Sequence, residues 1–88
     1  MTEPRAGKAL ANENKYPYIV EISIGAPGLD LLSRQILAFH KSRRVRPRHG
    51  RSFTKGDLVY SRWCFSELTT ARNFLEQFGG AFYKITAA

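Results

Sequence analysis

RSFTKGDLVYSRWCF, residues 51–65, is the segment on which the choice between two folds depends. It contains two short β-like runs on either side of Lys55-Gly56, a pair suited to a tight turn because glycine tolerates a positive φ. The sequence therefore predicts a hairpin, whose longer strand spans residues 57–65. By alternation, one side of that strand carries Val59, Trp63 and Phe65, and the other carries Leu58, Tyr60, Arg62 and Cys64.

Upstream of the hairpin, YPYIVEISIG at residues 16–25 has the alternation of a strand with one buried side. The side chains on its buried face are Tyr18, Val20, Ile22 and Ile24. Gly25, Pro27 and Gly28 then interrupt the strand. Apolar residues recur at helical spacing after this break and predict a helix over residues 29–42.

Downstream of the hairpin, Ser66 is a favourable N-cap for a second helix, which Gly79-Gly80 ends. AFYKIT, beginning at Ala81, predicts a final strand. This order of elements is that of a ferredoxin-like βαββαβ two-layer sandwich of class α+β, with both helices on one face of a sheet in the order 4-1-3-2. If the run at about 51–54 is too short to pair, the alternative is a three-stranded βαβαβ sheet.

The length of 88 residues fits one domain, and we expect a single α/β domain over residues 16–88 with a basic connection at 40–55. Residues 1–15 show no apolar period of either strand or helix and predict a disordered N-terminal tail. No apolar run approaches the ~20 residues that a membrane-spanning helix requires. Because residues 1–14 also lack the apolar stretch of a secretory signal, we expect a cytoplasmic protein without membrane contact.

RWCFSELTTARNFLEQFGG, from Arg62 to Gly80, carries a resemblance to short uncharacterised bacterial proteins. The shared pattern is an Arg-aromatic-Cys-Phe strand end followed by a helix that closes in Phe-Gly-Gly. The resemblance covers under a quarter of the chain. That family has no assigned activity, so the resemblance implies a folded domain and no mechanism.

The positive charge of the chain is concentrated in HKSRRVRPRHGRSFTK, residues 40–55, which contains no acid. Its seven cations equal the net charge of +7, so the remaining residues are electrically balanced. Clustered arginines contact phosphates and release counterions, which predicts nucleic-acid binding, or docking of an acidic protein. The predicted nucleic-acid-binding residues are Lys41, Arg43, Arg44, Arg46, Arg48, Arg51 and Lys55.

The face of the sheet opposite the helices is expected to be open and half apolar, which favours self-association as a homodimer. The expected interface residues are Ile19, Tyr60, Arg62 and Phe82. On this face Glu21 is expected to form a salt bridge with Arg62 or Lys84. The alternative function is therefore a protein-interaction module.

The chain offers little that points to catalysis, and we expect a binding protein that is not an enzyme and has no cofactor. Cys64 is a nucleophile only with a base nearby, and nothing places His40 or His49 beside it. One cysteine and two separated histidines lack the paired spacing of a zinc site. Lys55-Gly56 matches the start of the third strand of an RNA-recognition motif, but Asp57 and Val59 stand where that motif requires aromatics.

Overall fold

The computed structural model of this chain describes residues 4–86, and residues 1–3 and 87–88 lie outside the description. It contains three α-helices, one short 3-10 helix and four strands. In chain order these are α1 (Pro4–Lys15), β1 (Tyr18–Gly25), η1 (Ala26–Gly28), α2 (Leu29–Ser42), β2 (His49–Lys55), β3 (Leu58–Phe65), α3 (Leu68–Phe78) and β4 (Ala81–Ile85). The helix predicted over residues 29–42 is confirmed at both ends.

The four strands form one antiparallel sheet in the order β2-β3-β1-β4. This is the predicted order 4-1-3-2 counted from the opposite edge, in an α+β chain. The second strand is long enough to pair, from His49 opposite Trp63 to Lys55 opposite Leu58, so the three-stranded alternative is wrong. The predicted hairpin is confirmed, and Gly56 adopts φ +60° at its turn.

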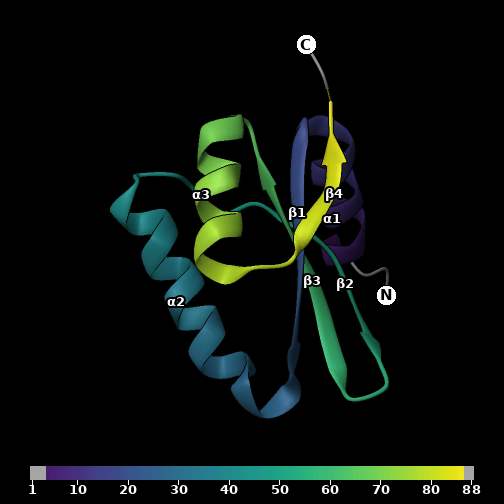
Figure 1. Cartoon of the computed structure of the whole chain (residues 1–88). Coiled ribbons are helices and arrows are strands. Elements are labelled where there is room, and N and C mark those ends of the chain that lie inside the picture. Colours follow the sequence, from purple (N-terminus) through teal and green to yellow (C-terminus); the bar gives the residue numbers. More distant parts are fainter. Residues whose placement is uncertain (1–3, 87–88) are drawn as a thin grey trace.

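Helices α2 and α3 cover one face of the sheet, and α1 lies on the other face (Figure 1). The main core lies between the sheet and helices α2 and α3, and Phe74 of α3 is the fully buried residue at its centre. The ring of Phe74 meets the ring of Phe39 of α2 edge to face, with centroids 5.4 Å apart. The buried residues of this core are Val20, Ile22, Ile36, Phe39, Trp63, Phe65, Ala71 and Phe74.

One histidine is buried in this aromatic core. His40 is only 1% exposed, and its ring is stacked on Phe65 with centroids 5.6 Å apart. Its Nδ1 lies 2.8 Å from the carbonyl oxygen of Ile36, to which it donates a hydrogen bond. Burial lowers the pKa of His40 below its ordinary value, and the nearby charge of Arg43 lowers it further.

The prediction of a disordered tail is wrong for residues 4–15, which form α1. The helix is held mainly by polar contacts, and Glu13 is central to them although it is a carboxylate only 4% exposed. Glu13 accepts hydrogen bonds from the backbone N–H and the guanidinium of Arg51, and from Arg62 Nη1 at 3.1 Å. Its own carbonyl oxygen accepts a bond of 2.8 Å from Lys84 Nζ. The helix is therefore attached to three different strands.

The close approach of α1 requires a glycine in β2. A Cβ atom built on Gly50 would lie 2.8 Å from Cβ of Arg62 and 3.1 Å from Cγ of Glu13. The register of β2 against β3 shifts between His49 and Ser52, so the strand is irregular where the helix contacts it. None of the helices in the described part of the chain combines the length and the apolar character needed to cross a membrane.

Candidate functional site

The seven predicted phosphate-binding cations are spread over three elements. Lys41 is in the last turn of α2, and Arg51 and Lys55 belong to β2. Only residues 43–48 form a connection, which is shorter than the predicted 40–55 because both of its ends are in regular structure. The four loop cations are Arg43, Arg44, Arg46 and Arg48. The structure therefore divides the seven cations between a helix end, a short loop and a strand.

Two of these arginines are engaged within the chain. The guanidinium of Arg43 lies over the ring of Phe39, 3.9 Å from its centroid, where it covers the end of the core. Arg51 Nη2 is 2.9 Å from Glu13 Oε1. Arg44, two residues after the end of α2, adopts a left-handed conformation with φ +56°. The cations of the segment thus differ in how freely they meet a ligand.

The predicted interface is also divided between the two faces. Ile19 is fully buried and lies outside the main core, on the face that α1 covers. Phe82 pairs with Val20 and packs against the core under α2 and α3, so its assignment to the open face is wrong. Of the four predicted interface residues, only Tyr60 and Arg62 lie on the expected face of the sheet and are not fully buried there. The expected ion pair is confirmed for Arg62, whose Nε is 2.9 Å from Glu21 Oε2.

An aromatic surface occupies the part of this face that α1 leaves uncovered. The rings of Phe53 on β2 and Tyr60 on β3 are parallel, with an angle of 3° and centroids 4.9 Å apart. Arg62 continues the surface, since its guanidinium is 3.6 Å from the ring centroid of Tyr83 on β4 and 5.6 Å from that of Phe53. We call Phe53, Tyr60, Arg62 and Tyr83 the aromatic platform.

The platform is accessible on β2 and β4 and cationic at its β2 edge, whereas Tyr60 and Arg62 on β3 are half-buried. Phe53 is 41% exposed and Tyr83 47% exposed. Arg51, Phe53 and Lys55 alternate along β2, which places both cations on the same side of the strand as the aromatic ring. Sequence reasoning missed Phe53 and Tyr83, although this alternation of cation and aromatic is visible between residues 51 and 55.

Further along the same face, the sheet is closed to ligands. Ile19 pairs with Cys64, and both are buried. Burial raises the pKa of the Cys64 thiol to about 11, and the charge of Glu13 contributes to this rise. The thiol therefore stays protonated at neutral pH and is a poor nucleophile. The candidate site is thus the outer part of the face, at the platform.

Comparisons with protein-family models, with curated proteins and with solved structures give no match to this chain.

Proposed function

We propose that this protein is a non-enzymatic binding protein that holds single-stranded nucleic acid on the aromatic platform. In this proposal its fold is a ferredoxin-like sandwich to which α1 is added on the second face. The observation that carries the proposal is the parallel pair of rings formed by exposed Phe53 and half-buried Tyr60, beside Arg51, Arg62 and Lys55. Bases of a single strand stack on aromatic rings, while cations beside the rings contact the phosphates.

Ion pairs within the chain reduce the positive charge that the platform offers to phosphates. Glu13 and Glu21 neutralise part of the charge of Arg51 and Arg62, with N–O distances of 2.9 Å in each pair. Lys55 and the loop over residues 43–48 are then the main sources of phosphate contacts. With three or four such contacts, the log–log salt slope is about −2 to −3, because each contact to a single strand adds roughly −0.7.

The test is a titration of a fluorescent mixed-sequence single strand of about ten nucleotides, within the usual site size, followed by anisotropy at low and physiological salt. Phe53→Leu and Tyr60→Leu keep apolar side chains but remove the rings, and each is expected to weaken binding by at least about fivefold. Thr54→Val, on the opposite side of β2, is the matched control and leaves affinity unchanged. Equal affinity for all four proteins, or binding that ignores salt, contradicts the proposal.

The exposed rings of the platform support one competing proposal, self-association through this surface. Phe53 and Tyr83 are large exposed side chains on one face, as a dimer contact requires. Sedimentation velocity over a wide concentration range separates the two proposals. A monomer at every concentration removes self-association, whereas a dimer that Phe53→Leu dissociates supports it.

A further inference from the structure

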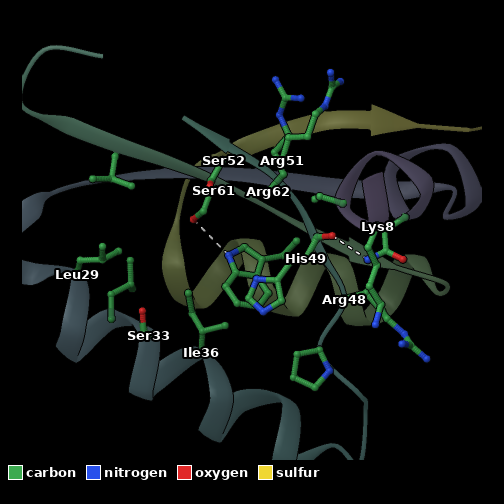
Figure 2. A pocket seen from close by; sticks show the side chains of 17 residues that line it. Lys8, Leu29, Ser33, Ile36, Arg48, His49, Arg51, Ser52, Ser61 and Arg62 are labelled. Atoms are coloured by element: carbon green, nitrogen blue, oxygen red, sulfur yellow. Dashed lines mark hydrogen bonds between the residues drawn. The ribbon is translucent and has the colours of Figure 1, made fainter. Parts of the chain in front are cut away.

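A second candidate binding site is a groove of about 740 Å³ between α1, α2 and the hairpin, which shares Arg62 with the platform but none of its rings. Figure 2 shows Leu29, Ser33 and Ile36 of α2 on one side, facing Ser52 and Ser61 of the hairpin. Leu32 completes the apolar wall on α2, and Val59 and Trp63 line the groove from β3. The volume is within the range of small-molecule sites, roughly 300–1,000 Å³.

The α1 end of this groove is cationic. Lys8 of α1 and Arg48 of the loop both line the groove, while Arg51 and Arg62 point away from α2 (Figure 2). No aspartate or glutamate is among the described residues that line the groove. Within the described part of the chain, neither Lys8 nor Arg48 forms an ion pair. Among the described residues no acidic side chain offsets these two charges at the groove, and such a cationic site attracts an anion.

We propose that the groove binds a small amphiphilic carboxylate, with its apolar body between α2 and β3 and its carboxylate at Lys8 and Arg48. The aliphatic wall of Leu29, Leu32 and Ile36 suits an acyl chain, because it offers contact area without directional polar groups. A guanidinium binds a carboxylate through paired hydrogen bonds, which suits Arg48 to the charged end. The apolar part of this site is separate from the rings of the platform, whereas Arg48 is shared with the loop to which the proposed function assigns phosphate contacts.

Trp63 provides a direct readout, because it lines the groove and is the only tryptophan of the chain. We expect decanoate, added below its micelle concentration, to change Trp63 fluorescence saturably with far-UV circular dichroism unchanged. Decyltrimethylammonium has the same chain with a positive head and is expected not to bind. No saturable change with decanoate, or equal binding of the cation, overturns the proposal.

Two variants locate the site. Ser33→Phe fills the groove from α2 and is expected to abolish the response, whereas Ala38→Phe on the exposed side of the same helix retains it. Arg48→Glu is expected to weaken decanoate binding about tenfold or more, the effect of losing one charge-assisted hydrogen bond. Arg72→Glu makes an equal charge change at an exposed residue of α3 and is the control. Because Arg48→Glu changes a loop side chain and adds no bulk to the groove, it keeps the proposal testable if Ser33→Phe does not fold. Unchanged affinity in Arg48→Glu, or in a folded Ser33→Phe, overturns the assignment.

Discussion

Replacing Glu13 by Gln is expected to loosen α1 from the sheet, because this carboxylate joins the helix to two arginines. Glu13 is 4% exposed, and its oxygens are 2.9 Å from Arg51 Nη2 and 3.1 Å from Arg62 Nη1. Burial alone raises the pKa of Glu13, but hydrogen bonds from Arg51 and the charge of Arg62 outweigh this effect and lower the pKa below its usual value. The charged form is therefore the one that the fold stabilises.

The loss of unfolding free energy depends on which contacts Arg51 and Arg62 keep after Glu13 is replaced. Removing one partner of a buried ion pair costs about 3–5 kcal/mol. The Arg51 side chain is 48% exposed and regains water, and Arg62 keeps its bond to Glu21. We therefore expect Glu13→Gln to lower the free energy of unfolding by about 2–3 kcal/mol, below the full value for a buried pair.

Urea denaturation followed by circular dichroism measures this loss, and Glu76→Gln on the exposed side of α3 is the control, expected within about 0.5 kcal/mol of the parent chain. A second measurement follows the reaction of Cys64 with a disulfide reagent. Cys64 is 2% exposed, and its pKa is about 11, so the reaction requires local opening. Loosening of α1 is expected to make the reaction of Cys64 faster. An unfolding free energy equal to that of the parent, with no gain in Cys64 reactivity, refutes the role of Glu13.

Three further predictions concern the core and the backbone. Because burial lowers the pKa of His40, the unfolded chain takes up a proton before the folded chain does as pH falls below about 6.5. The free energy of unfolding is therefore expected to decrease below that pH. Denaturation at several pH values should show a smaller decrease for His40→Phe than for the parent chain. Gly80→Ala is expected to destabilise strongly in thermal melts, because Gly80 has φ +92° and an added Cβ would collide with the backbone carbonyl oxygen of Glu21. Gly7→Ala in α1 is the control, because its Cβ would meet nothing within 4 Å, and it should not destabilise. Phe74→Ala removes a fully buried ring and is expected to cost about 3–5 kcal/mol in urea denaturation, and a loss below about 1 kcal/mol would contradict its central place in the core.

Local patterns were sufficient to predict most of the sheet and the two helices of the main core. Apolar spacing after Gly28 predicts α2, and Gly79-Gly80 marks the end of α3, where both glycines have positive φ. These features depend on neighbours in the sequence, so they are visible without the fold. The strand order also followed, because the order of the elements restricts the connections that a sheet can make.

Helix α1 was missed because its attachment is polar and distant in the sequence. Glu13 contacts residues 38 and 49 positions away, and the one large aliphatic side chain of residues 4–15, Leu10, is 41% exposed, so apolar residues do not mark the buried side. Missing α1 also led to the wrong expectation for Ile19, which would be exposed on an uncovered face. The aromatic platform was found only in part, since the pairing of Phe53 with Tyr60 depends on the register of the hairpin.

The distance in sequence between α1 and its partners has a consequence for the order of folding. The helix is made before β2 and β3, yet its contacts to Arg51 and Arg62 are 38 and 49 residues further along. At a synthesis rate of about 5–20 residues per second, α1 waits roughly 2–10 s for them. Contacts with such long loops form late, so α1 should dock after the hairpin has paired. During that interval the strip of β1 around Ile19 is exposed to chaperones and to other nascent chains.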